Sequence, residues 1–170
     1  FMLTLRIAAE GDRIAYAPDA YAQEAPSASM ADEMTRKVRI AAGGFQSIVR
    51  LPALLNPLRH GRLAFQYVSH RVLRWTLAPA LLPVVFVLNA LLAVQHGGVY
   101  AGLLAAQVAF YGCAAYGALT HTHRRGPSGL YAPFYFVAMN VAVYRGFVRF
   151  TRKQQTVRWE KAQRAAPVAS

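Results

Sequence analysis

The chain has 170 residues, which suits one domain, and its 19 Lys and Arg outweigh 7 Asp and Glu to give a net charge of +12. Its only cysteine, Cys113, excludes an intrachain disulfide and a zinc cluster built from cysteines. Six acids lie before residue 34, whereas seventeen bases follow it and flank long apolar runs, a pattern typical of the cytoplasmic face of a membrane protein.

Residues 1–44 are expected to belong to a soluble α/β layer. Apolar residues at helical spacing from Phe1 onward predict a helix that Gly11 ends, and residues 13–17 predict a short strand that Pro18 ends. One helix and one strand are too few to bury a core. We therefore expect the sequence to be a fragment of a longer chain.

A second helix is expected from about Met30 to Ala42. Ser29 followed by Asp32 resembles an N-cap with an acid in the first turn, which favours the helix dipole. The pair Gly43-Gly44 is expected to interrupt this helix.

Residues 45–74 are expected to form amphipathic helices that lie in the membrane interface. Arginines alternate there with apolar clusters, and Pro52 and Pro57 divide the segment into pieces too short to span a bilayer.

Two membrane spans are predicted next. Residues 75–94 and 100–119 each form an uncharged run of twenty positions, which as a helix measures about 30 Å, one hydrocarbon thickness. A tight turn at 95–98 is expected to join them. The glycines of the second run are expected to allow close helix approach, namely Gly102, Gly112 and Gly117. Asn89 and Asn140, within apolar runs, are expected to hydrogen-bond across helices.

A third apolar segment, at about 130–148, leaves two alternatives open. A full span would place the basic tail, residues 151–170, outside the cell and against the positive-inside trend. A re-entrant or interfacial segment would keep the tail in the cytoplasm, and the apolar run of only fifteen residues before Arg145 favours this alternative. The tail is expected to be cytoplasmic and partly disordered.

The topology and the source follow from charge and composition. The arginine-rich segment before residue 75 is expected to be cytoplasmic, as is the N-terminal part. The Ala- and Arg-rich usage indicates a GC-rich bacterial source. We therefore expect a multi-pass protein of the bacterial inner (plasma) membrane that contacts membrane lipid.

Three cations lie within four positions of the second helix: Arg36, Lys37 and Arg39. They can converge on an anionic group, and arginine forks suit phosphate geometry. On spacing alone, contact with lipid phosphates is favoured over a substrate site.

The segments 3–8, 13–20 and 36–46, followed by the apolar spans, resemble in order the C-terminal part of membrane family 2 glycosyltransferases, the group that includes cellulose, chitin and hyaluronan synthases. The resemblance implies the C-terminal edge of a GT-A α/β domain, then interfacial helices and two or three transmembrane helices. It also implies transfer of a sugar from a nucleotide sugar to a sugar or lipid-linked acceptor at the cytosolic membrane face, in cell-surface polysaccharide or glycolipid synthesis.

The same resemblance implies a division of roles along the parent enzyme. The catalytic Asp of the family and its Asp-x-Asp site for Mg2+ or Mn2+ precede this stretch, so the chain alone is expected to be inactive and to lack the metal ligands. The family's Gln-x-x-Arg-Trp box falls on residues 36–40, which implies substrate binding by Arg36, Lys37 and Arg39. Only Arg39 keeps the family's residue, and Ile40 in the Trp position favours a non-processive or short-chain transferase.

Other interpretations explain less of the sequence. A small non-enzymatic membrane protein, such as a transporter subunit or an assembly factor, accounts for the spans but not for the α/β piece. Nucleic acid is not expected as a partner, because the bases flank membrane segments and no recognition fold is present. His121 and His123 lack further metal ligands nearby, and residues 155–159 repeat the Gln-x-x-Arg-Trp order only after the spans.

Overall fold

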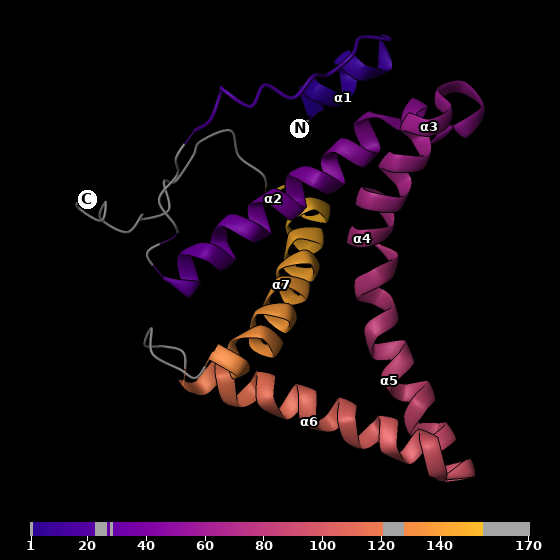
Figure 1. Ribbon diagram of the computed structural model, residues 1–170, viewed down its shortest axis with the longest axis vertical. Coiled ribbons are helices and arrows are strands. Elements are labelled where there is room, and N and C mark those ends of the chain that lie inside the picture. Colours follow the sequence, from indigo (N-terminus) through magenta and orange to yellow (C-terminus); the bar gives the residue numbers. More distant parts are fainter. Residues whose placement is uncertain (1, 23–26, 28, 121–127, 155–170) are drawn as a thin grey trace.

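The computed structural model describes residues 2–22, 27, 29–120 and 128–154, and its regular elements in these ranges are all helices (Figure 1). The expectation of a mainly α-helical protein is confirmed. In chain order the helices are α1 (Met2–Ala9), α2 (Met30–Arg50), the 3-10 helix η1 (Pro52–Leu55), α3 (Pro57–Tyr67), the π-helix η2 (Val68–Val72), α4 (Leu73–Trp75), α5 (Leu77–His96), α6 (Gly98–Thr120) and α7 (Ser128–Thr151).

The N-terminal segment contains one of its two predicted elements. α1 agrees with the predicted helix, and the chain leaves it through Gly11 in a left-handed conformation (φ 101°). The strand predicted for residues 13–17 is wrong, because these residues are exposed and have no regular secondary structure. A strand needs a neighbour to complete its hydrogen bonds, and the described part of the chain offers none.

α2 begins as predicted but does not end where the glycines predicted. The Ser29 hydroxyl accepts a hydrogen bond from the Asp32 backbone N–H (3.1 Å), which confirms the N-cap. The interruption predicted at Gly43 and Gly44 is wrong, since the helix continues to Arg50. Each glycine disfavours a helix by about 1 kcal/mol, and tertiary packing on the buried side of α2 offsets this.

The segment after α2 is divided as its prolines predicted. Pro52 and Pro57 begin η1 and α3, where a missing backbone N–H leaves no helical bond unmade. The pieces are held by a small apolar cluster of Leu51, Leu54 and Tyr67, against which α1 packs. The position of these helices in a membrane interface stays a prediction.

α5 and α6 correspond to the two predicted spans. They are the two helices of the described residues that are long and apolar enough to cross a membrane. Only 11% and 6% of their most apolar stretches is buried inside the protein, unlike the core helix of a soluble domain. Gly97 and Gly98, both with positive φ, make the predicted turn between them.

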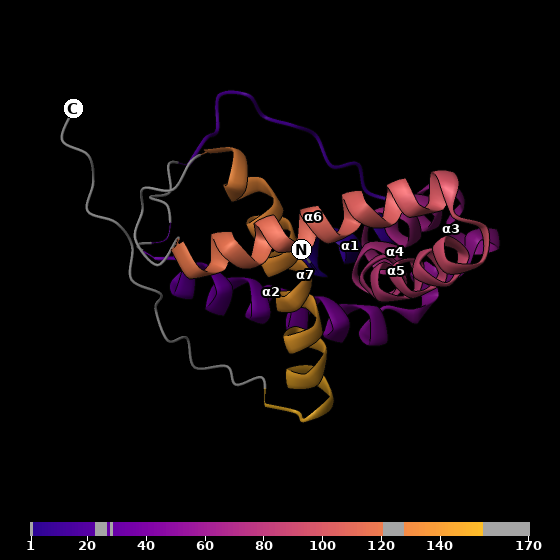
Figure 2. The same ribbon diagram turned by 90° about the horizontal axis from the view of Figure 1, so that it is seen from below.

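The third apolar segment forms one continuous helix, α7, which packs mainly along α2 and α6. In Figure 1, α5, α6 and α7 form the three sides of a triangle, and α2 lies against α7. Figure 2 shows from below that α7 crosses α2. We call α5 with α6 the hairpin, and α2 with α7 the base layer.

Candidate functional site

The first turns of α2 bring two of the three predicted site residues onto one carboxylate. Arg36 donates to Glu33 from Nε to Oε2 (3.0 Å) and from Nη2 to Oε1 (2.8 Å). Lys37 Nζ lies 3.5 Å from the same Oε1, and the Ser27 hydroxyl donates to Oε2 (2.7 Å). Residues three and four positions apart are neighbours on a helix surface, which explains the cluster. The two-point contact fixes the plane of the Arg36 guanidinium.

This cluster keeps Glu33 ionised. The hydrogen bonds from Arg36 lower the pKa of Glu33 to about 2, aided by Ser27 and by the charge of Lys37, while burial opposes the shift. The Glu33 side chain is 14% exposed, whereas that of Arg36 is 42% exposed. At neutral pH the Glu33 carboxylate therefore orients Arg36 and Lys37. The combined positive charge of Arg36, Lys37 and Arg39 still exceeds its single negative charge.

Arg36 lies on the side of α2 that faces away from α7. The opposite side of α2 is marked by Val38, Ala41 and Ala42, whose atoms approach Gly146 of α7. Successive residues are offset by about 100° around a helix, so Arg36 points away from this contact, while Arg39, three positions before Ala42, lies to the side of it. The sequence predicted that the cations share a helix, but it did not identify Glu33 as the residue that binds two of them.

The contact between α2 and α7 depends on the absence of a side chain at Gly146. A Cβ on this residue would lie 2.5 Å from the Ala41 Cβ and 2.9 Å from the Val38 carbonyl oxygen. Ala41, Ala42 and Ala142 are buried at the same contact. Small residues thus let the two backbones approach closely, and this fixes the rotation of α2 and the direction of its cationic side.

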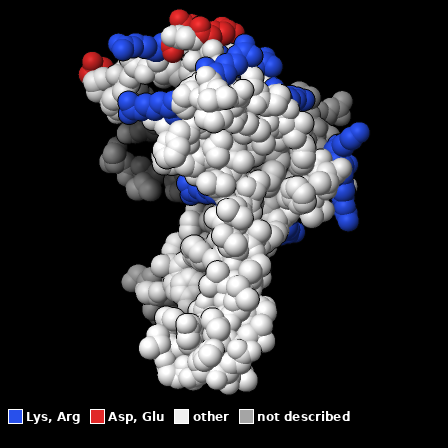
Figure 3. All heavy atoms as spheres, turned by 90° about the vertical axis from the view of Figure 1, so that its right-hand side faces the viewer, with Lys and Arg blue, Asp and Glu red and all other residues white. Residues whose placement is uncertain are grey.

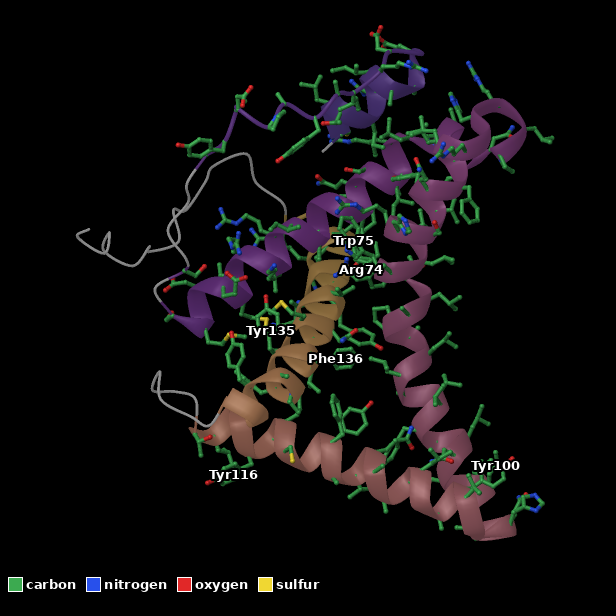
Figure 4. The ribbon with its side chains drawn as sticks, viewed as in Figure 1. Arg74, Trp75, Tyr100, Tyr116, Tyr135 and Phe136 are labelled. Carbon is green, nitrogen blue, oxygen red and sulfur yellow. The ribbon has the colours of Figure 1, made fainter. Side chains whose placement is uncertain are left out.

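An aromatic junction joins α2, α4 and α7. Phe45 lies 5.2 Å from Phe147, 6.1 Å from Phe150 and 6.4 Å from Trp75 between ring centroids. Figure 4 shows Trp75 and the neighbouring Arg74 where α4 meets the crossing of α2 and α7. Such ring pairs contribute about 0.5–1.5 kcal/mol each beyond their burial.

Trp75 also rests on a glycine. A Cβ on Gly44 would lie 1.4 Å from the Trp75 Cζ3, so the indole occupies the space that any other residue would fill. The Arg71 guanidinium lies 5.6 Å from the centre of the same ring. The sequence predicted residue 75 only as the start of a span. In the sequence, the signal for this packing was a glycine next to an aromatic residue within α2.

The hairpin contains one polar pair. The Asn89 side-chain amide donates to the Gln107 side-chain oxygen (2.8 Å) and joins α5 to α6, as predicted for Asn89. The Asn140 amide instead donates to the Phe136 carbonyl (2.8 Å) within its own helix. This contact of Asn140 stays within one helix, so it is not the predicted bond across helices.

The charged side chains are concentrated away from the turn of the hairpin. In Figure 3 the Lys, Arg, Asp and Glu residues lie over the upper part of the molecule, while the lower part is formed by uncharged residues. Exposed apolar side chains of this lower part include Val94, Val99 and Leu103. The cationic cluster of α2 is thus separated from the most apolar part of the surface.

A metal ion has no evident place among the described residues. No three His, Cys, Asp or Glu side chains come together there in a way that could bind one. The resemblance implies that the ligands of Mg2+ or Mn2+ precede this stretch of the parent enzyme, and that stays a prediction. His121, His123, residues 155–159 and most of the predicted tail lie outside the described ranges.

The fold and the site define a mainly helical protein whose two most apolar helices are suited to a membrane and whose α2, packed on α7, holds a cationic cluster. Comparisons with protein-family models, with curated proteins and with solved structures found no match.

Proposed function

We propose that this chain is the membrane-anchoring region of a family 2 glycosyltransferase. The enzyme would transfer a sugar from a nucleotide sugar to a sugar or lipid-linked acceptor at the cytosolic face of a bacterial inner membrane. It would act in cell-surface polysaccharide or glycolipid synthesis. The sequence resemblance supports the family, and the geometry of α2 supports the role of this region.

One observation carries the proposal: α2 is fixed on one side and cationic on the other. The contact with Gly146 and the aromatic junction fix its rotation beside the hairpin. Arg36 then projects away from α7, and Glu33 holds the Arg36 guanidinium in one orientation. A helix held this way can present fixed positive charge to a ligand without reorganising.

The chemistry that needs this charge is departure of a nucleoside diphosphate. When the bond from the sugar to the diphosphate breaks, negative charge accumulates on the leaving oxygen. We assign compensation of that charge to Arg39, with Arg36 and Lys37 binding the phosphates, because guanidinium and ammonium groups donate strongly to phosphate oxygens. α1, packed on the Leu51 cluster, would be the edge of the GT-A domain.

The divalent metal and the catalytic base belong to other residues of the parent enzyme in this proposal. The metal, when bound, neutralises the diphosphate. The residues of this chain anchor the enzyme, orient α2 and supply its cations. The replacement of the family's Trp by Ile40 removes a stacking surface for a polymer end, which favours a non-processive or short-chain transferase.

The test uses the full-length parent protein in detergent and measures release of nucleoside diphosphate from candidate nucleotide sugars. Arg39→Ala is expected to lower turnover about 100-fold or more, the effect of removing one donor to developing charge. Arg50→Ala is the matched control, because it removes the same charge from the exposed far end of the same helix. Equal turnover of the two variants would remove Arg39 from the site.

A different outcome would favour the non-enzymatic alternative. If the parent bound no nucleotide sugar, and translation of the gene began at Met2, a small membrane protein such as a transporter subunit or an assembly factor would be the better description. The start of translation is read from the gene and the mass of the expressed protein, without any activity assay.

A further inference from the structure

We infer that α7 is not a third membrane span but an interfacial helix, which lies on the same side of the bilayer as α2 and binds anionic phospholipid headgroups through its basic end. This inference concerns the orientation of the chain in the membrane. It does not depend on the transferase activity proposed above. It rests on where the two ends of α7 lie relative to the hairpin.

The first half of α7 lies beside the last half of α6. Phe136 of α7 packs on Phe110 of α6, with ring centroids 5.7 Å apart. α6 ends at Thr120 and α7 begins at Ser128, so the connection between them is short. Figure 1 shows the start of α7 next to the end of α6. The beginning of α7 is thus placed at one open end of the hairpin.

The last half of α7 lies at the beginning of α5. The Tyr144 hydroxyl donates to the Pro79 carbonyl (2.5 Å), and Pro79 belongs to the first turn of α5. Further along α7, Phe147 reaches the aromatic junction, where Trp75 lies two residues before the start of α5. The end of α7 is thus placed at the other open end of the hairpin.

Both open ends of a two-span hairpin lie on one side of a bilayer. α5 leaves that side near Leu77, and α6 returns to it near Thr120. A helix that runs from the end of α6 to the start of α5 therefore begins and ends on this side. Its neighbour α2 carries six charged side chains and is itself unsuited to the hydrocarbon, so the whole base layer lies outside it.

The basic end of α7 supplies the partner. Arg145, Arg149 and Arg152 recur at helical spacing on one side, followed by Lys153. Arg145, Arg152 and Lys153 are exposed, whereas the Arg149 Nε is covered by the protein itself. Exposed cations at a membrane surface meet lipid phosphates, and each strengthens the attraction to an anionic leaflet about fivefold. Phosphatidylglycerol headgroups match this surface in charge.

The first test places the tail relative to the hairpin. In a Cys113→Ser background, single cysteines are introduced by Thr35→Cys in α2, Gln95→Cys at the turn of the hairpin and Gln154→Cys after α7, all at exposed positions. Sealed vesicles of both orientations are labelled with a membrane-impermeant maleimide. We expect the cysteines at 35 and 154 to label from one side and the cysteine at 95 from the other.

Two outcomes would overturn the inference. Labelling of positions 95 and 154 from the same side, opposite to 35, would make α7 a third span. Labelling of all three from one side would show that the hairpin does not cross. The Cys113→Ser variant alone is the control for membrane insertion. If it also fails to insert, a loss of insertion in all variants is due to this background substitution and not to the surface cysteines.

The second test addresses the headgroups. The detergent-solubilised protein is titrated with phosphatidylglycerol and with phosphatidylcholine, and bound lipid is counted by native mass spectrometry. Arg145→Gln is expected to lower the preference for phosphatidylglycerol about fivefold, the factor expected for one lost surface charge. An unchanged preference would contradict the assignment of anionic headgroups to this end of α7.

Discussion

The base layer and the hairpin use glycine and apolar residues in opposite ways. In the base layer, Gly44 and Gly146 each leave room for a neighbouring group that a Cβ would displace. In the hairpin, Gly102 and Gly112 have nothing within 4 Å of a would-be Cβ. The base layer is therefore organised by contacts inside the protein, whereas the hairpin presents its apolar surface outward.

This difference indicates that the two regions are suited to different solvents. The base layer buries small and aromatic residues where its two helices meet, as a soluble helix pair does. The hairpin buries little, and its helices are long and apolar enough to be surrounded by hydrocarbon. Substitutions at matched positions in the two regions should therefore have opposite effects.

The largest effect is expected at Gly146. Gly146→Ala places a methyl group 2.5 Å from the Ala41 Cβ and close to backbone atoms of α2, which cannot swing aside. We expect a loss of about 2–3 kcal/mol in unfolding free energy, in the range of overpacked cores. The measurement is thermal or denaturant unfolding of the purified protein in detergent.

Gly112→Ala in the hairpin is the matched control. Its methyl group meets open space, and alanine favours a helix over glycine by up to about 1 kcal/mol. We expect this variant to be as stable as the original chain or slightly more stable. Destabilisation of both variants by the same amount would contradict the distinction between the two regions.

A smaller effect is expected at Gly44, because the group displaced is a side chain. Gly44→Ala forces the Trp75 indole off α2 and opens the aromatic junction. We expect a loss of about 1–2 kcal/mol. In a Trp159→Phe background the Trp75 fluorescence should shift to longer wavelength. Gly43→Ala, one position away and in open space, should cause neither change.

Glu33 should make the stability of α2 sensitive to acid. Its pKa is lowered to about 2 in the folded protein from an ordinary value of 4.5, so its stabilisation is present above about pH 4.5 and is lost as the pH falls toward 2. Because the cluster is partly exposed, we expect less than about 1 kcal/mol. Glu33→Gln should flatten this part of the pH–stability profile. A profile unchanged by the substitution would contradict the role of Glu33.

The smallest effect is expected at the polar pair of the hairpin. Asn89→Leu removes the hydrogen bond to Gln107. Such bonds between membrane helices average about 0.6 kcal/mol, so the loss should be near this value. Asn140→Leu is the control, since its amide bonds within α7 and does not join α5 to α6. Crosslinking of α5 to α6 through introduced cysteines should weaken only in the first variant.

Much of the helical architecture was predictable from local signals. Ser29 with Asp32 located the start of α2, the prolines located η1 and α3, and two uncharged runs located the hairpin. These features depend on residues near one another in the sequence. The same local reasoning was wrong about Gly43 and Gly44, because the packing that offsets their cost in a helix comes from distant residues such as Trp75, about thirty residues away.

The candidate site was predictable only in part for the same reason. The helical spacing of Arg36, Lys37 and Arg39 was visible, but the side of α2 on which they lie depends on Gly146 in a distant helix. The glycines of α6 were predicted to allow close helix approach, and this is wrong for Gly102 and Gly112. Residue type alone does not specify which glycine faces a neighbour.

The most direct measurement is the distance between the turn of the hairpin and the residue that follows α7. Spin labels at Gln95→Cys and Gln154→Cys, in a Cys113→Ser background reconstituted into bilayers, are compared by double electron–electron resonance with a second pair at positions 95 and 35. If the base layer lies on one side of the bilayer, both pairs are separated by about 30 Å or more, one hydrocarbon thickness. A distance well below about 20 Å between 95 and 154 would show that α7 crosses the membrane and would contradict the division into hairpin and base layer.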